Sequence, residues 1–291
     1  ATGWDLYNPT EYGYGEYQNV INEIQLERIL APNGPTMGHV KRPSDGKTPK
    51  EILFIQCVGS RDIERAYCSG VCCMIALKNA KLLKEEIPDC HITICYIDIR
   101  AFEKNFEEYY MRTRDQGIDF IRGKVPELIE DSETKNLKVR VYSSLTDEII
   151  KIDADLVVLS TAVLPSKGTR QIADVLGIDY DTNGYLTEHH FGLSPQETKY
   201  LGIYICGFAQ GPKNISYSVS QARAAASKVA ELTSKGEAEL ELICAIVDEE
   251  NCISCDRCEK NCPKNAIIVP EGKIAEVDEI NCDGCGICAT C

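Results

Sequence analysis

The sequence lacks features that would point to several common classes of protein. Basic residues are scarce, since 31 Lys and Arg stand against 45 Asp and Glu, which gives a formal net charge of −14. A phosphate backbone or an anionic membrane would repel such a chain, which argues against a nucleic acid partner. The longest apolar run, residues 156–164, is about half of the roughly 18 residues that span a bilayer, so no membrane insertion is expected.

Two further absences concern the start of the chain and nucleotide binding. The chain opens with Ala1-Thr2-Gly3 and has neither an initiator Met nor the basic and apolar segments of a signal peptide, so we expect a piece of a longer cytoplasmic polypeptide. No Gly-x-Gly-x-x-Gly motif is present to hold the pyrophosphate of NAD(P)H. We therefore expect electrons to enter through metal clusters and not as hydride.

What the sequence has in excess is cysteine. Of 16 cysteines, eight lie between Cys252 and Cys291 and four between Cys57 and Cys73. Disulfide-rich secreted chains are usually short and rich in loops, whereas these cysteines stand at ligand spacings within a long α/β pattern. The clustering favours metal binding in a reducing cytoplasm.

The C-terminal cysteines form an internal repeat. The run Cys252-x2-Cys255-x2-Cys258-x3-Cys262-Pro263 is followed, thirty residues after its start, by Cys282-x2-Cys285-x2-Cys288. In two-cluster ferredoxins three cysteines of one run and the fourth of the other hold each [4Fe-4S] cube, and zinc has no use for the third cysteine. We expect one cluster on Cys262, Cys282, Cys285 and Cys288, and another on Cys252, Cys255, Cys258 and a distal cysteine.

Two possibilities remain for the distal cysteine that completes the cluster on Cys252, Cys255 and Cys258. The thirty-residue offset places it at position 292, whereas the last cysteine is Cys291. Either Cys291 substitutes as a ligand or the natural protein continues, and we favour the second. Between the runs, residues 266–269 and 273–277 alternate like a hairpin, so residues 245–291 resemble a bacterial two-cluster ferredoxin of the α+β class.

The rest of the chain reads as an α/β protein. Residues 52–55 form an apolar run, residues 71–86 an amphipathic helical stripe and residues 91–97 a second strand, which is a βαβ unit. Its first loop carries cysteines in place of glycines: Cys57, Cys68, Cys72 and Cys73. They could bind a third cluster near the positive end of the helix, or be buried inert thiols.

A segment that could form part of a flavin site follows downstream. Strand-like segments at residues 120–121, 137–142 and 148–152 form a meander that leads into a buried strand at residues 155–160. Residues 202–206 read as a strand that ends in Gly207 and Gly211 and opens a helix of small residues at 218–232. Such a turn lets backbone approach a flavin or its phosphates closely. Residues 42–50 read as a solvated connection between domains.

Taken together, the chain resembles the A-subunit family of heterodisulfide reductase, flavin and iron-sulfur proteins of methanogens and related bacteria. The resemblance rests on the runs Tyr12-Gly13-Tyr14-Gly15, Arg42-Pro43-Ser44-Asp45-Gly46-Lys47, Phe54-Ile55-Gln56-Cys57-Val58-Gly59-Ser60-Arg61-Asp62, Tyr67-Cys68-Ser69-Gly70-Val71-Cys72-Cys73-Met74, Asp98-Ile99-Arg100-Ala101-Phe102 and Ala209-Gln210-Gly211-Pro212-Lys213. It implies part of a thioredoxin-reductase-like flavoprotein with two dinucleotide domains, plus the ferredoxin domain. The implied layout is the end of the first FAD-domain half and a connection at 1–50, an inserted nucleotide-binding-like domain at 51–162, the second FAD part at 163–240 and the ferredoxin domain at 245–291.

The family also implies cofactor contacts. FAD would be bound by Gly207, Ala209, Gln210, Gly211, Ser218, Gln221 and Ala222, and the third [4Fe-4S] cluster by Cys57, Cys68, Cys72 and Cys73. Lys78, one turn beyond Cys73, would point toward the flavin and tune its potential, its alternative being an ordinary solvated lysine.

The function implied by the resemblance is flavin-based electron bifurcation in methanogenesis. Electron pairs from a hydrogenase or formate dehydrogenase would be split between ferredoxin and CoB-CoM heterodisulfide. The heterodisulfide would be reduced on the partner B and C subunits, and the present chain would form a homodimer within the complex. Alternatives are a related subunit of a quinone-interacting membrane-bound oxidoreductase, a flavin-free electron-wire module, and an NAD(P)H-dependent disulfide reductase. The last is disfavoured by the missing glycine motif.

Overall fold

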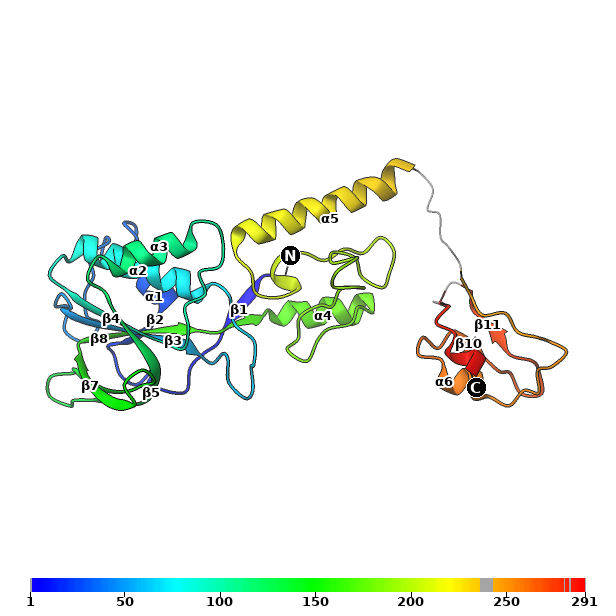
Figure 1. The fold of residues 1–291 in the computed structure, drawn as a ribbon, viewed down its shortest axis with the longest axis horizontal. Helices are drawn as coiled ribbons and strands as arrows, with labels where there is room; N and C mark the ends of the chain where they lie inside the picture. Colours follow the sequence, from blue (N-terminus) through cyan, green and yellow to red (C-terminus); the bar gives the residue numbers. More distant parts are fainter. Residues whose placement is uncertain (1, 236–242, 280, 283, 291) are drawn as a thin grey trace. The chain divides into compact units, whose positions relative to one another are not determined.

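The structure, a computed structural model, describes residues 2–235, 243–279, 281–282 and 284–290 (Figure 1). It divides into two compact units, Ala1–Val229 and Ala230–Cys291. The first combines a mixed sheet with helices, which confirms the expected α/β class. In the described part of the chain, none of the helices is long and apolar enough to cross a bilayer.

A seven-stranded sheet organises the first unit. Its order is β2 (Val20–Asn22), β8 (Leu156–Thr161), β3 (Glu51–Val58), β4 (His91–Tyr96), β5 (Asp119–Glu130), β6 (Leu137–Ser143) and β7 (Glu148–Ala154). In this order the five strands β2, β8, β3, β4 and β5 are parallel to one another. The last three strands, β5, β6 and β7, form the expected antiparallel meander. Because β2 precedes residue 51, the sheet extends further upstream than the segment 51–162 expected from the sequence.

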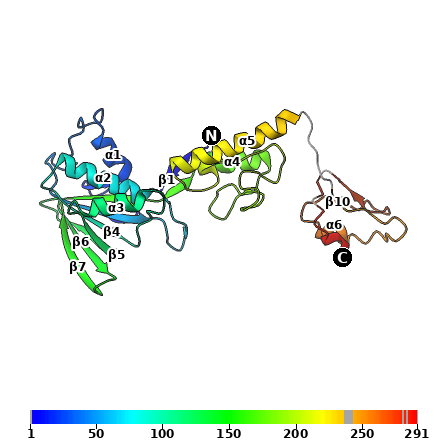
Figure 2. The same ribbon diagram turned by 45° about the horizontal axis from the view of Figure 1, so that its top comes forward.

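Three helices cover one face of this sheet: α1 (Glu23–Leu30), α2 (Cys72–Glu86) and α3 (Phe106–Arg114) (Figure 2). Alternate side chains of the central strands, such as Phe54 and Ile94, pack with Leu77 and Leu83 of α2. Burying each of these side chains contributes about 1.5–3 kcal/mol. The helix over 71–86 that the apolar stripe predicts is thus confirmed, and its packing fixes the start of α2 near the end of β3.

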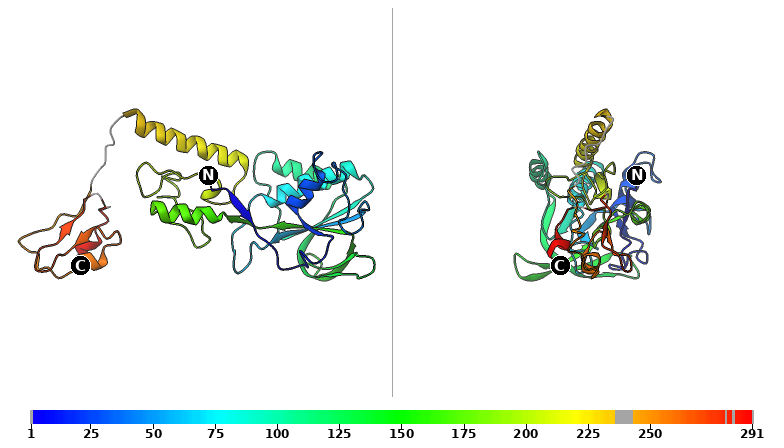
Figure 3. Two further views of the ribbon diagram at one scale, coloured as in Figure 1. Left: turned by 180° about the vertical axis from the view of Figure 1, so that it is seen from behind. Right: turned by 90° about the vertical axis from the view of Figure 1, so that its right-hand side faces the viewer.

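The other face of the parallel strands is covered by the meander, which curls beneath it (Figure 3). Leu53 and Val157, which alternate with the helix-facing positions, pack with Val139 and Val141 of β6. The central strands β3 and β8 are therefore buried on both faces, which explains why they read as continuous apolar runs and not as alternating ones.

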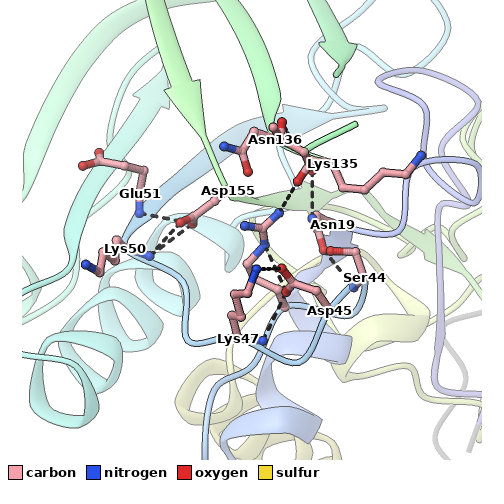
Figure 4. A network of polar contacts seen from close by, with 11 residues as sticks. Asn19, Ser44, Asp45, Lys47, Lys50, Glu51, Lys135, Asn136 and Asp155 are labelled. Carbon is pink, nitrogen blue, oxygen red and sulfur yellow. Dashed lines mark hydrogen bonds and ion pairs between the residues drawn. The ribbon is translucent and has the colours of Figure 1, made fainter. Parts of the chain in front are cut away.

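The amino ends of the strands are fixed by a polar network around residues 42–50 (Figure 4). Asn19 donates to the carbonyl of Lys135 and accepts from the backbone of Ser44, and Arg42 donates to the carbonyl of Thr134. The Asp155 carboxylate accepts from the backbone N–H groups of Lys50 and Glu51. Arg42 is 8% exposed, so the expectation of a merely solvated connection is wrong for this residue.

The rest of the first unit follows the sheet. A two-stranded ladder pairs β1 (Trp4–Leu6) with β9 (Val163–Pro165), and α4 (Lys167–Leu176), the short helix η1 (Gly207–Ala209) and α5 (Ile215–Lys235) come after it. The strand expected at 202–206 is not formed. Among the described residues this stretch finds only one bridge, between Tyr204 and Glu197, so its backbone lacks a neighbouring strand along its length. The helix expected at 218–232 is present and begins three residues earlier.

The second unit is small and irregular. It contains α6 (Arg257–Asn261), β10 (Ile267–Ile268), β11 (Glu276–Val277) and η2 (Ile287–Thr290). The strands β10 and β11 pair antiparallel, with Ile267 opposite Val277, as the sequence between the two cysteine runs predicts. Ile267 and Ala266 are buried, which gives this hairpin a small apolar core next to the cysteine loops.

Candidate iron-sulfur and flavin sites

The second unit encloses a cavity of about 760 Å³ between its two cysteine runs. Seven expected ligands line it, and we call them the ferredoxin cysteines: Cys252, Cys255, Cys258, Cys262, Cys282, Cys285 and Cys288. Backbone amides point at the sulfurs, since Ala266 donates to Cys262 Sγ at 3.2 Å and Ala245 to Cys282 Sγ at 3.3 Å. Such N–H···S contacts are suited to anionic thiolates, and the donor set fits cubane clusters.

The fourth ligand of the first run is not defined by this geometry. Cys291 lies outside the described residues, so its expected role is not tested. Cys244, for which the sequence analysis gives no role, also lines the cavity. It precedes the first run and has no ligand spacing to it, which is why the pattern gave no signal for its position.

The other four expected ligands lie where the parallel strands end, and we call them the edge cysteines: Cys57, Cys68, Cys72 and Cys73. Cys57 is at the end of β3 with a left-handed backbone, φ 61°, while Cys72 and Cys73 begin α2. The charges of Cys68 and Cys73 both act on Cys57, and those of Cys57 and Cys73 act on Cys72. Cys57 near the end of β3 and Cys72 and Cys73 at the start of α2 lie at the same edge of the sheet, with Cys68 in the loop between them.

The surroundings give these thiols different pKa values. Burial raises the pKa of Cys57 to about 11, and the charge of Cys73 adds to this, while the Arg61 guanidinium acts in the opposite direction. A hydrogen bond between Cys72 and Cys73 lowers the pKa of Cys73 to about 7 and, together with burial, raises that of Cys72. A cluster would need all four as thiolates, so cationic neighbours matter at this edge.

The chemistry of the edge cysteines is compatible with the cluster expected there. All are free thiols, so a disulfide does not occupy them. In the part of the chain that the structure describes, no three His, Cys, Asp or Glu side chains gather as ligands to a single metal ion would. Two thiols at the start of a helix and two in the segment before it, with arginines nearby, match the charge of a thiolate-bound cube.

Two arginines and an aspartate lie beside the edge cysteines, and sequence reasoning had given them no role. Arg61 donates to both carboxylate oxygens of Asp98 at 2.6 and 2.9 Å, and Arg100 donates to the same group at 3.0 Å. The Cys73 thiol donates to the backbone carbonyl of Asp98 at 3.8 Å. The only signal in the sequence is that these residues lie within runs shared with the family.

A cavity of about 790 Å³ in the first unit joins α2 to the start of α5. Of the expected cofactor residues, Cys72, Lys78, Ser218 and Ala222 line it, although they come from segments more than a hundred residues apart. Its walls include the aromatic rings of Trp4 and Phe208, which pack 5.9 Å apart. The volume and the apolar walls with few polar groups are typical of a cofactor pocket.

Charged groups at this cavity come from α1, α2 and Lys213, which precedes α5. Lys78 Nζ contacts the Glu27 carboxylate at 2.5 Å, and both residues line the cavity. Glu23 also lines it, and burial raises the pKa of its carboxyl to about 8 even though Ser160 donates to it at 2.6 Å. Sequence reasoning missed Glu23 and Glu27, because nothing in the chain order shows that α1 faces α2 at this place.

The remaining expected flavin contacts form a hydrogen-bonded group next to η1. The Gly207 N–H donates to Gln221 at 2.9 Å, Gln221 donates to Gln210 at 2.5 Å, and Lys213 donates to the Gly207 carbonyl at 3.0 Å. Lys213 and Phe208 line the cavity. The described residues that line it do not include the five other expected contacts: Gly207, Ala209, Gln210, Gly211 and Gln221. Of these five, Gly207, Gln210 and Gln221 are joined by hydrogen bonds around the short helix that contains Phe208.

Comparison with known proteins gives consistent results. A 4Fe-4S binding domain matches residues 245–268. The A subunit of the H2/formate:CoB-CoM heterodisulfide, ferredoxin reductase of Methanococcus maripaludis is 52% identical over 93% of this chain and 42% of its own length. The first iron-sulfur A subunit of the CoB-CoM heterodisulfide reductase of Methanopyrus kandleri is 49% identical over 96% of this chain and 44% of its own length.

Among solved structures, thioredoxin reductase of T. acidophilum is similar, with a TM-score of 0.49 and 16% identity over 80% of this chain and 64% of that one. The chain spans less than half the length of the two methanogen relatives. The chain belongs to the A-subunit family of heterodisulfide reductase.

Proposed function

We propose that this chain is the FAD and iron-sulfur part of an electron-transfer subunit in a cytoplasmic heterodisulfide reductase-type complex. In that complex, electron pairs from a hydrogenase or formate dehydrogenase are split between ferredoxin and CoB-CoM heterodisulfide. The B and C subunits reduce the disulfide, and a second copy of this chain completes the complex. The relatives' names support ferredoxin and the heterodisulfide as the two acceptors.

One observation carries the proposal: a single cavity joins an edge cysteine to residues expected to contact flavin. Cys72 and Lys78 of α2 line it together with Ser218 and Ala222 of α5. A bound flavin would exchange an electron pair with one partner and single electrons with another. A flavin in this cavity would lie against Cys72, so that single electrons need cross only a short distance to a cluster on the edge cysteines.

The chain's own residues have distinct roles in this proposal. Trp4 and Phe208 provide apolar walls that exclude water, and Ser218 and Ala222 present a close-fitting helix surface. Lys78 places a cation at the cavity, and Glu27 holds it there. A cation at this position favours the electron-rich form of any redox group bound next to it. The ferredoxin cysteines hold two further clusters, and Cys262 serves the cluster of the second run.

The proposal also assigns the domains. Residues 51–162, with β2 and α1 packed on them, form the inserted domain that carries the edge cysteines, and residues 163–240 form the second FAD part. Residues 1–50 include the end of the first FAD part, and residues 245–291 form the ferredoxin domain. The ladder of β1 with β9 supports this division, because it leads the chain into and out of the sheet.

The test uses the full-length protein purified without oxygen, in which flavin and iron are measured after denaturation. We expect bound flavin, and we expect Cys72→Ala to lose about four irons per chain, since one cube would be lost. Cys95→Ala is a matched control, because Cys95 is equally buried but lies on β4 among apolar side chains. Protein without flavin, or equal iron in the Cys72→Ala and Cys95→Ala variants, would contradict the proposal.

A further inference from the structure

Arg61 lies next to an edge cysteine, and both its backbone and its side chain are fixed there. It follows β3 with a left-handed backbone, φ 57°, which costs energy for a residue other than glycine. Its side chain is 19% exposed, it lines a small cavity together with Cys57, and its guanidinium donates to Asp98. A cation so fixed beside a thiol is shielded from the solvent that weakens charge interactions at the surface.

Asp98 explains how the guanidinium is kept in place. It follows β4, the neighbour of β3, and accepts both arms of Arg61 in a bidentate pair. Such a pair fixes the orientation of the guanidinium and not only its distance. Arg100 shares the carboxylate, so two cations face one anion and these three side chains together have a net charge of +1.

A cluster on the edge cysteines would respond to that charge. Reduction adds one electron to the cube, with no bond formed and no proton taken up, so the cluster becomes more negative. A nearby cation and an N–H···S hydrogen bond stabilise the reduced form more than the oxidised form, which raises the reduction potential. Removing the cation should therefore make the potential more negative.

We propose that Arg61 sets the reduction potential of the cluster on the edge cysteines, with Asp98 as the residue that positions it. The inference rests on the third cluster of the proposed function. It adds a determinant of how readily this cluster accepts an electron, and it assigns a role to the arginine that follows β3 in place of a glycine-rich loop.

The experiment is a redox titration of the full-length protein, followed by electron paramagnetic resonance of each cluster. Arg61→Gln should lower the midpoint potential of one signal by at least about 59 mV. For a one-electron couple, this shift lowers the reduced-to-oxidised ratio at a fixed potential tenfold. Arg61→Lys keeps the charge without the bidentate fork and should give a smaller shift. Signals of the ferredoxin cysteines should not move in either variant.

The control is Arg140→Gln. Arg140 also pairs with a carboxylate, Glu127 at 3.2 Å, but on the meander, and its loss should leave every midpoint unchanged. Cys68→Ala identifies the signal of the edge cluster by removing it. If no signal is lost in Cys68→Ala, the proposed cluster itself is refuted. If the signal is present and Arg61→Gln has the same midpoint as Arg140→Gln, the cluster stands and the role of Arg61 is refuted.

If Arg61→Gln loses the cluster, its iron content will be lower. In that case the midpoint potentials of two milder variants test the inference. Arg61→Lys keeps both cations beside Asp98 but loses the fork, and Arg100→Gln keeps Arg61 as the one cation. Both variants should lower the midpoint by a shift that changes the reduced-to-oxidised ratio less than tenfold. Unchanged midpoints in both variants would overturn the inference.

Discussion

At the scale of single residues, His91 shows how a charge pattern joins strands. It is the first residue of β4, and its ring nitrogens lie 2.9 Å from Glu51 of β3 and 2.8 Å from Asp119 of β5. Burial alone would lower the pKa of His91, but the hydrogen bonds to Asp119 and Glu51 outweigh it, so the pKa is raised. The imidazolium is therefore favoured in the folded state.

This pKa shift predicts a pH dependence of stability. A group whose pKa is raised on folding contributes stability that is fully present below its unfolded value, about 6.5, and lost as the pH rises through the folded value. We expect His91→Gln to cost a few tenths of a kcal/mol at pH 5.5 and less at pH 9, because the ring is 48% exposed. Denaturant unfolding at both pH values measures the difference.

His189→Gln is the matched control, since His189 is an exposed histidine outside the sheet. The change in free energy of unfolding between the two pH values in His91→Gln is compared with the change in this variant. A loss for His91→Gln that grew toward pH 9 would show that the imidazolium is not what joins the strands.

At the scale of elements, Gly123 controls how β5 changes partner. The strand pairs in parallel with β4 through Arg122 and antiparallel with β6 from Gly123, with a register irregularity between Lys124 and Glu127. A Cβ at Gly123 would overlap the carbonyl of Tyr142 on β6. Glycine is thus needed here for the close approach of two backbones.

We predict that Gly123→Ala destabilises the protein by about 1–3 kcal/mol, because the clash forces β5 and β6 apart. The matched substitution is Gly168→Ala in α4, where the nearest atom to a new Cβ is Ser166 Oγ at 3.7 Å. Alanine favours helix over glycine by up to about 1 kcal/mol, so this variant should be unchanged or more stable. Equal unfolding midpoints for the two variants in urea would contradict the assigned role of Gly123.

The elements also show what a sequence can predict. The strands β3 and β8 and the helix α2 are evident from apolar runs and a helical stripe, because their burial depends on local periodicity. The stretch 202–206 has the same apolar character but forms no strand, since a strand also needs a partner whose position the local pattern does not encode. The burial of Arg42 is equally hidden, because it depends on Thr134, which is distant in the chain.

The same distinction applies to the candidate sites. The ferredoxin cysteines follow a spacing fixed by the size of the cube, so all seven described members line one cavity as expected. Lys78 could be placed at a cavity because α2 carries both it and Cys72. Glu27, its partner, is brought there by the packing of α1 beside α2, and Asp98, which holds Arg61, by the pairing of β4 with β3. Neither arrangement is written in a local pattern.

At the scale of the whole chain, charge is divided unequally. Residues 230–291 contain 14 Asp and Glu against five Lys and Arg, a formal charge of −9 out of −14 in about a fifth of the sequence. A small unit with that charge attracts cationic redox partners and repels anionic ones, and salt screens both effects over about 10 Å at 0.1 M. Exchange of electrons with this unit should therefore depend strongly on the charge of the reagent.

We predict that a cationic viologen radical reduces the clusters of the ferredoxin unit more slowly as salt is raised, whereas an anionic reductant such as dithionite reduces them faster. Stopped-flow absorbance of the full-length protein between 0.02 and 0.5 M salt, roughly the range over which the Debye length falls severalfold, measures both rates. Changing the exposed Glu249, Glu250 and Glu271 to Gln removes three of the nine net charges and should flatten both dependences. Two reagents that respond to salt in the same direction would show that the charge of this unit does not control its encounters, because screening an attraction and screening a repulsion must change the rates oppositely.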